Sequence, residues 1–250
     1  MAVRRYTAGK IISLVFKIVF VALVVFVFGL LIWRMFSSKV PSSMKSLTIT
    51  DKAVQSYQVY LAEKELYDSD KNAYAAQKGT DEAPVFAYYQ EQAEITRSDD
   101  AYGYFAINQV VIIPGSNQVQ VLFRYNKSTL KHVAEDFELD SVPDATEQPF
   151  DISLLITTQG GGTQTRVAPT SVTTKITTLY CYYRFVFDGV DIDPETTEGV
   201  FLDVYYKERV NYDARPYGTL CIYDYKSKNI PFKLSSSDEK ALKQAAEKQN

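Results

Sequence analysis

Five carboxylates lie close together in a segment that joins two predicted strands. Of all segments in this sequence, this one has the spacing most like that of a metal-binding loop. They are Asp188, Asp191, Asp193, Glu195 and Glu198. Calcium takes about six to eight oxygen ligands, and a loop with carboxylates at alternate positions supplies several of them. An EF-hand loop would have glycine and glutamate where this chain has Thr196 and Leu202. We therefore expect a solvated acidic hairpin and keep a calcium site as the weaker alternative.

Cys181 and Cys221 are the only cysteines, and both fall in segments with strand-like composition. They would pair in an oxidising compartment if their strands were neighbours with Cα atoms about 5.5 Å apart. The interpretation that we favour is two buried free thiols that pack as small apolar side chains.

The sequence contains no motif that indicates catalysis. His132 is the single histidine, and no G-x-S-x-G nucleophile motif is present, so neither a hydrolase triad nor a tetrahedral zinc site is predicted. We predict no enzyme activity, no cofactor and no metal beyond the weak calcium candidates. An unrecognised enzyme would need carboxylates that face one another in a cleft. The candidates for such a pair are Asp99, Asp100, Glu135 and Asp136.

Two short motifs have simpler interpretations than the chemistry they resemble. Gly160-Gly161-Gly162 precedes a threonine-rich strand and not a helix, so it predicts a hairpin tip and not a phosphate cradle. Asn126-Lys127-Ser128 matches a glycosylation sequon, which occurs often by chance.

Tyrosine is the main compositional deviation, with 19 Tyr beside 14 Phe in 250 residues. Alternate tyrosines of a strand point to one face, and an exposed row of them would suit a protein, peptide or glycan partner. The alternative is that tyrosine simply suits half-buried sheet positions. The strand tyrosines in question are Tyr102, Tyr104, Tyr180, Tyr182, Tyr183, Tyr205, Tyr206, Tyr212, Tyr217, Tyr223 and Tyr225.

Strands with turn residues between them dominate the chain beyond residue 102. The firmest prediction is a hairpin of 102–113 and 118–125 around Pro114-Gly115-Ser116-Asn117. Further strands are predicted at 150–158, 163–167, 170–188 (one bent strand or two), 200–206 and 219–225. These features favour a mainly β fold, an immunoglobulin-like β-sandwich with one or two peripheral helices. An α+β fold with a mixed antiparallel sheet is the alternative.

Helical patterns are few. Val54, Tyr57 and Leu61 recur at helical spacing in 51–66, with Thr50 or Asp51 as N-cap. One or two helical turns are predicted within 126–137, and a polar, weakly docked helix at 238–248. Residues 68–83 read as a solvated loop or frayed helix, and 84–95 are ambiguous between strand and helix.

These elements follow an apolar stretch, Ile11–Trp33, that is too long for an ordinary core helix. It contains 16 consecutive apolar or glycine residues from Ile18 to Trp33. A transmembrane helix needs about 20, which the flanking residues supply if Lys17 or Arg34 extends to the interface. The alternatives are a signal peptide cleaved near Val40-Pro41-Ser42 and a buried core helix. We predict a retained membrane anchor.

The distribution of charge gives the orientation. Residues 1–50 hold seven of the 27 basic residues and no Asp or Glu, so the rest of the chain has 30 acidic residues against 20 basic. Such an acidic domain is not expected to bind nucleic acid. Four basic residues precede the apolar core of the span and three follow it, which slightly favours a cytoplasmic N-terminus.

The sequence thus predicts a basic cytoplasmic tail (1–10), a transmembrane anchor (11–36) in contact with the lipid bilayer, a tether (37–46), an extracytoplasmic β domain (47–234) and a polar tail (235–250). We expect a single-pass protein of the cell membrane that acts as a non-catalytic interaction or structural module of the cell envelope. A ligand- or calcium-binding sensor accessory domain is the alternative, followed by an unrecognised enzyme.

Overall fold

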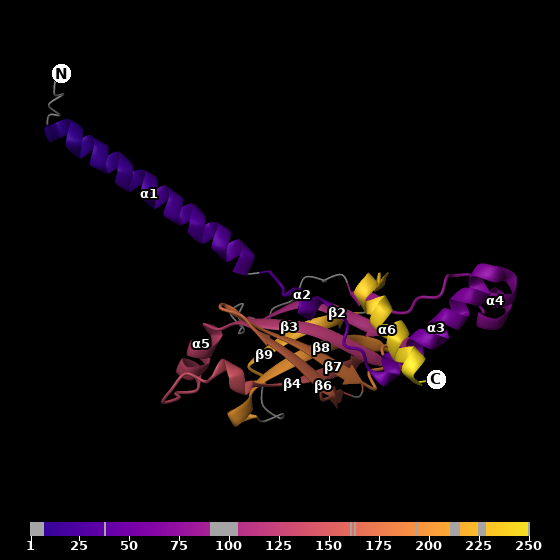
Figure 1. Ribbon diagram of the computed structural model, residues 1–250. Helices are drawn as coiled ribbons and strands as arrows, with labels where there is room; N and C mark the ends of the chain where they lie inside the picture. The colour runs from indigo at the N-terminus through magenta and orange to yellow at the C-terminus, as the bar shows by residue number, and fades with distance from the viewer. Residues whose placement is uncertain are drawn as a thin grey trace, which may run out of the picture. The chain divides into compact units, whose positions relative to one another are not determined.

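The computed structural model describes residues 8–37, 39–90, 105–160, 162, 164–193, 195–210, 216–224 and 229–249. The chain divides into two compact units, Met1–Lys39 and Val40–Asn250. The first unit contains one helix, and the second contains two β-sheets with helices around them (Figure 1).

Helix α1 (Ala8–Ser37) contains a stretch, Ile12–Met35, that is long and apolar enough to cross a membrane. None of that stretch is buried, and the side chain of Phe16 is 76% exposed. The core-helix alternative is therefore wrong, because a core helix has its apolar faces covered by protein. A signal sequence near an N-terminus has the same length and composition, so the membrane span itself stays a prediction.

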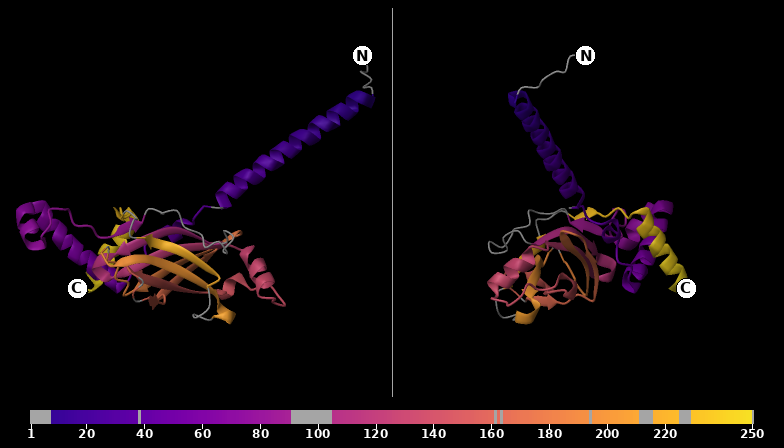
Figure 2. Two further views of the ribbon diagram at one scale, coloured as in Figure 1. Left: turned by 180° about the vertical axis from the view of Figure 1, so that it is seen from behind. Right: turned by 60° about the vertical axis from the view of Figure 1, so that its left-hand side comes forward.

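The second unit is mainly β, with two antiparallel sheets packed as a sandwich, as predicted (Figures 1 and 2). The six-stranded sheet has the order β10-β1-β2-β3-β7-β6, and the four-stranded sheet has the order β5-β4-β8-β9. The strands are β1 (Tyr88–Gln90), β2 (Phe105–Ile113), β3 (Gln118–Asn126), β4 (Phe150–Thr158), β5 (Thr165–Val167), β6 (Ser171–Ile176), β7 (Tyr180–Asp188), β8 (Thr197–Tyr206), β9 (Gly218–Asp224) and β10 (Asn229–Pro231).

The turns lie at the residues that predicted them. Strands β2 and β3 form the predicted hairpin around the short helix η1 (Pro114–Ser116), and Asn117 takes the left-handed conformation with φ 48°. Strands β4 and β5 form a second hairpin, whose turn contains Gly160 with φ 78°. The predicted run 170–188 is a third hairpin, β6–β7, and not one bent strand.

Aromatic side chains fill the space between the sheets. Phe105 of β2 packs edge-on against Phe150 of β4, with ring centroids 5.1 Å apart. Tyr125 of β3 stacks on Tyr183 of β7, and their hydroxyl oxygens are 3.2 Å apart. Burial raises the pKa of Tyr183 to about 12 and raises that of Tyr125 further. This neutral pair is the polar element of an otherwise apolar interior.

Helices α3 (Asp51–Ser69) and α6 (Ser236–Gln249) cover part of the outer face of the six-stranded sheet. Val54 and Tyr57 of α3 pack with Val111 of β2 and with Leu242 of α6. As predicted, Thr50 is the N-cap of α3, where its hydroxyl accepts from the Ala53 N–H at 3.1 Å. The second unit therefore combines a sandwich with the helix-covered face that the α+β alternative implied.

Two polar segments are more ordered than the sequence suggested. The C-terminal helix α6 was predicted to be weakly docked, but Leu242 is fully buried against α3. Residues 68–83 contain the helix α4 (Lys71–Lys78), which Asp70 caps at its start by accepting from two backbone N–H groups. Helix α3 extends beyond the sheets and carries α4 at its far end (Figure 1). Tyr67 and Tyr74 join the two helices edge to face, with centroids 5.3 Å apart.

The segment Val40–Thr50, here called the strap, lies against the outer face of the six-stranded sheet and includes the helical turn α2 (Ser42–Lys45). Met44 is buried against Leu122 and Tyr182 of that face. The guanidinium of Arg184 on β7 donates to the Met44 carbonyl at 2.6 Å.

Side chains from distant parts of the chain hold the rest of the strap. The amide of Gln120 on β3 accepts from the Thr48 N–H at 2.9 Å and donates to the Thr48 carbonyl at 2.8 Å. The Asp238 carboxylate on α6 accepts from the Leu47 N–H at 3.0 Å. Side chains thus supply hydrogen-bond partners to backbone groups of Met44, Leu47 and Thr48 in place of a neighbouring strand.

The outer face of the four-stranded sheet contains a different polar group. Asp203 of β8 is 2% exposed, and its carboxylate accepts from the Arg166 guanidinium at 2.8 Å and from the Thr219 hydroxyl at 2.9 Å. Arg166 also donates to the Ser153 hydroxyl at 2.8 Å. This charge is neutralised by residues of its own sheet.

Candidate functional site

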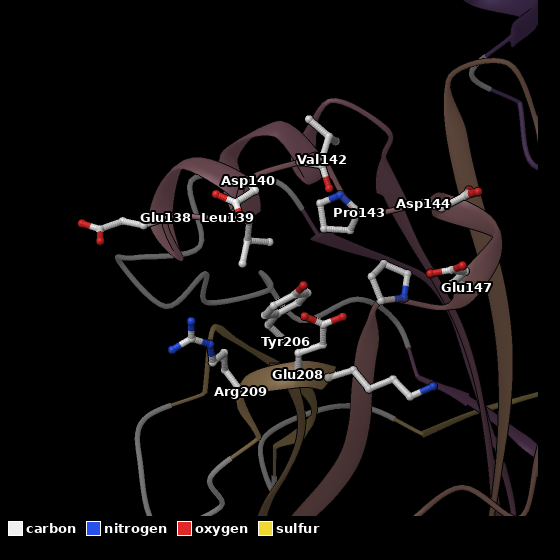
Figure 3. A pocket seen from close by; sticks show the side chains of 13 residues that line it. Glu138, Leu139, Asp140, Val142, Pro143, Asp144, Glu147, Tyr206, Glu208 and Arg209 are labelled. Atoms are coloured by element: carbon white, nitrogen blue, oxygen red, sulfur yellow. The ribbon is translucent and has the colours of Figure 1, made fainter.

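The main candidate site is a cavity of about 1030 Å³ at one end of the β domain (Figure 3). One wall is the loop Glu138–Pro149, which follows helix α5 (Thr129–Asp136) and includes the short helix η2 (Ala145–Glu147). The other wall is Tyr206–Arg209, at the end of β8 and in the short helix η3 (Lys207–Arg209).

Local backbone chemistry fixes the loop. The Asp144 carboxylate accepts from the Thr146 N–H at 2.8 Å and caps η2, and this hydrogen bond lowers the pKa of the Asp144 carboxyl. The Lys207 N–H donates to the Pro149 carbonyl at 2.9 Å, which joins the two walls. The cavity is therefore a built feature of the fold.

The middle of the cavity is partly apolar. The Tyr206 ring is 4% exposed and packs against Phe137, with centroids 5.0 Å apart. Burial, together with a hydrogen bond to Glu208, raises the pKa of Tyr206. Leu139, Tyr206 and Glu208 gather in the middle of the view in Figure 3. The site thus pairs a sheltered ring with one carboxylate.

The charge of the lining is negative. Its acidic residues are Glu138, Asp140, Asp144, Glu147 and Glu208, and its basic residues are Lys207 and Arg209. Such a cavity attracts cationic groups, and its ring and proline side chains offer apolar contact. Within the described part of the chain, no group of three or more His, Cys, Asp or Glu is arranged to hold a metal ion.

The structure does not bring the five predicted calcium ligands together. Asp193 uses its carboxylate within its own turn, where it accepts from the Glu195 N–H and the Thr196 hydroxyl, both at 2.9 Å. Asp188 accepts from the Gln118 side chain at 2.8 Å. The remaining three, Asp191, Glu195 and Glu198, are exposed. This segment forms an acidic turn between β7 and β8.

The two cysteines are free thiols in this structure. Cys181 is buried on β7 of the six-stranded sheet, whereas Cys221 lies on β9 of the four-stranded sheet. Burial raises the pKa of both thiols. Each thiol packs as a small side chain within its own sheet.

The residues considered for catalysis do not form a cleft among the described residues. His132 and Glu135 form a side-chain pair 3.5 Å apart on α5. Asp136 accepts from the Tyr217 hydroxyl at 2.7 Å. Asp99 and Asp100 lie outside the described residues, as does Gly161 of the triglycine. Asn126 of the sequon accepts from the Ser128 N–H at 2.9 Å.

An exposed row of tyrosines, one of the two readings of the tyrosine content, is not present in the described strands. Tyr182, Tyr183, Tyr205, Tyr206 and Tyr223 are at most 4% exposed. Tyr180 and Tyr217 are half-buried, and Tyr102, Tyr104, Tyr212 and Tyr225 lie outside the described residues. These rings fill the sandwich core or lie under covering segments, because a two-layer sheet fold needs large apolar side chains inside. A contact surface must therefore be sought elsewhere on the domain.

Sequence reasoning missed both the cavity and the strap contacts. The cavity walls are separated by more than 50 residues and carry no motif. Gln118 and Gln120 at alternate strand positions did signal a polar outward face, but nothing in the pattern indicated that a segment some 70 residues away would cover it.

No protein-family model, curated protein or solved structure matches this chain.

Proposed function

We propose that this protein is a single-pass membrane protein whose β domain is a non-catalytic, extracytoplasmic interaction or structural module of the cell envelope. The observation that carries the proposal is the strap. Only Ser38 and Lys39 separate the end of α1 from the strap in the sequence, and the strap is bonded to the sheet and to α6 by side chains. An apolar anchor is thus joined to a folded domain with almost no free linker.

A short attachment suits a module that works at the membrane surface. A flexible linker would let the domain explore a large volume, whereas two linking residues span at most about 7 Å. The proposed orientation, with the N-terminus in the cytoplasm, rests on Arg4, Arg5, Lys10 and Lys17 before the apolar core of the span. The immunoglobulin-like variety of sandwich fits such a module and stays a prediction.

Protease protection tests the topology with the full chain. We expect membranes to retain the protein through alkaline carbonate extraction, and external protease to remove a C-terminal epitope tag in right-side-out vesicles but not in inverted ones. A tag on the N-terminus is the matched control and should show the opposite pattern. Release by carbonate would overturn the anchor, and a shielded C-terminal tag in right-side-out vesicles would overturn the orientation.

The acidic cavity favours a second candidate function, a ligand-binding sensor accessory domain for cationic small molecules or basic side chains. Its test is thermal unfolding of the detergent-solubilised chain with spermidine as probe. We expect spermidine to raise the melting temperature, and Glu208→Gln to weaken that shift several-fold. Glu65→Gln, at an exposed position on α3, should leave the shift unchanged. An equal response of all three proteins would assign the effect to net charge and exclude the cavity.

A further inference from the structure

Strand β6 is a six-residue sheet edge whose side chains are exposed along most of its length. The six-stranded sheet ends at β10 and β6, and the four-stranded sheet ends at β5 and β9. Strands β10 and β5 have three residues each, and β10 includes Pro231, which has no N–H. Strand β9 packs against β2 of the other sheet. Proteins normally protect their edge strands by such means, because an open edge pairs with other chains.

The free edge of β6 is defined by its pairing with β7. The register joins Ser171 to Val186 and Ile176 to Cys181, and the Thr177 N–H donates to the Tyr180 carbonyl at 2.8 Å. Because backbone groups of an antiparallel strand alternate in direction, this bond sets which residues face β7. The residues that turn their N–H and C=O groups to the open edge are Val172, Thr174 and Ile176.

The side chains of β6 are suited to a sheet, and of these six only Ile176 packs against the core. Residues Ser171 to Lys175 are exposed, Ile176 is half-buried, and Val172 is 37% exposed. Four of the six residues are β-branched, which favours the extended conformation. Lys175 is the only charged residue of the strand. The strand is therefore preformed and carries a single charge.

The sequence of β6 is complementary to itself in one antiparallel register. If Thr174 lies opposite Thr174 of a second copy, Val172 faces Ile176 of that copy and Thr173 faces its Lys175. All three outward-facing residues then exchange backbone bonds, about six in total. Sliding the strands by two residues in one direction places the two Lys175 side chains opposite each other, and like charges in that position are destabilising. Sliding the other way leaves Ile176 of each strand without a partner in the opposite strand.

We propose that β6 pairs with β6 of a second copy of this chain about a two-fold axis at Thr174. The two six-stranded sheets then form one continuous sheet across the dimer, and the open edge is covered. Two copies anchored in one bilayer have a raised effective concentration, which strengthens a contact of modest area. That last step rests on the membrane attachment proposed above, whereas the register does not.

Disulfide trapping in the full chain tests the register. Hydrogen-bonded antiparallel residues have Cα atoms about 5.5 Å apart, which a disulfide can span. We expect Thr174→Cys, reconstituted in lipid vesicles and oxidised, to give several-fold more covalent dimer on non-reducing gels than the wild-type chain, whose two cysteines set the background. Thr173→Cys is the matched control, since its copies lie two positions out of register, and should stay at background. A monomeric Thr174→Cys, or equal trapping at 173 and 174, would overturn the proposal.

A charge at the axis provides a second measurement that does not depend on oxidation. Thr174→Lys places two lysines opposite each other and should convert the dimer to monomer in crosslinking with a lysine-independent reagent. Val142→Lys changes an exposed valine in the Glu138–Pro149 loop and should leave the dimer intact. Both side chains are exposed, so melting temperatures should change little. An unchanged dimer in Thr174→Lys would contradict the edge pairing.

The same samples separate this inference from the proposed function. If Thr174→Cys crosslinks in detergent micelles while carbonate releases the wild-type chain from membranes, the pairing holds and the anchor fails. If the chain stays in the membrane and Thr174→Cys remains monomeric, the pairing alone fails.

Discussion

The outer faces of the two sheets each bury one charged side chain, and they stabilise it in different ways. On the four-stranded sheet, Asp203 is paired with Arg166 at 2.8 Å and is hydrogen-bonded to Thr219. On the six-stranded sheet, Arg184 is 2% exposed and donates only to neutral oxygens, those of Met44 and of the Gln109 side chain at 2.7 Å.

This difference separates stability from positioning. The charge of Asp203 is compensated inside its own sheet, so the pair strengthens the fold. For Arg184, Nε and Nη1 have no hydrogen-bond partner within the described part of the chain, and burial lowers the pKa of its guanidinium to about 10. Arg184 remains charged at neutral pH, and the buried Asp238 carboxylate of α6, to which it donates no hydrogen bond, recovers only part of its desolvation cost. Its contribution is to hold the strap in place.

The largest expected effect is the removal of Asp203. Asp203→Ala should lower the free energy of unfolding by about 2 to 3 kcal/mol, because it leaves the Arg166 charge without its partner. The value lies below that for a fully buried pair, since the Arg166 side chain is 28% exposed and water recovers part of the loss. Urea unfolding of the detergent-solubilised chain, followed by circular dichroism, measures it.

The double variant Asp203→Leu with Arg166→Leu completes a cycle with its two single variants, Asp203→Leu and Arg166→Leu. It should be more stable than the sum of the two single changes predicts, since both charges leave together. Strict additivity would mean that the two side chains act independently, and the contrast with Arg184 would be lost.

The next effect concerns the strap. Gln120→Leu should cost about 1 to 2 kcal/mol, because both backbone groups of Thr48 lose their partner at a part-buried position. Amide hydrogen exchange should become faster at Thr48 in particular. Gln159→Leu, at an exposed turn, is the control and should change stability by less than about 0.5 kcal/mol. Unchanged exchange at Thr48 in Gln120→Leu would show that the strap is held by other contacts.

A neutral buried pair provides a reference for both charged sites. Tyr183→Phe should cost about 1 kcal/mol at pH 8, because the Tyr125 hydroxyl loses its partner. The folded pKa of Tyr183 is raised from its usual 10 to about 12, so its stabilisation is complete below pH 10 and is lost as the pH rises through 12. The difference between wild type and variant should therefore shrink over this range. A constant difference in pH-dependent urea unfolding would contradict the burial of an ionisable hydroxyl.

The smallest expected effect is that of Arg184→Met. Losing two hydrogen bonds and the attraction to Asp238 is partly offset by removing a buried, partly unsatisfied charge, so stability should fall by less than about 1 kcal/mol. Hydrogen exchange should nevertheless become faster in the strap around Met44 and not in β4 or β8. A loss as large as that of Asp203→Ala would remove the distinction drawn between the two faces.

The sequence predicted elements whose signals are local. The β2–β3 hairpin follows from alternating apolar residues around Pro114–Asn117, and α3 follows from its apolar spacing and the Thr50 cap. The docking of α6 was not predictable, because it depends on Leu242 meeting α3 and on Asp238 meeting Leu47, 191 residues away. The burial of the strand tyrosines was not predictable for a related reason. Alternating side chains show that a strand has two faces, but they do not show that both faces will be covered.

The candidate site was harder to predict than the fold. The acidic run 188–198 attracted attention through its spacing, yet Asp193 uses its oxygens on its own turn. The cavity instead joins residues 138–149 to 206–209, whose composition is that of ordinary loops. The packing of Tyr206 on Phe137 and the hydrogen bond from the Lys207 N–H to the Pro149 carbonyl bring these segments together.

The order of the strap contacts has a mechanical consequence. The strap is held at three successive points along the chain. Met44 is bonded to Arg184, Leu47 to Asp238 and Thr48 to Gln120. A pulling force from the N-terminal side would load these bonds one after another, as in a zipper, and would not shear them all at once. A force that lifts Val40 away from the sheet would therefore detach the strap before it loaded the sheets.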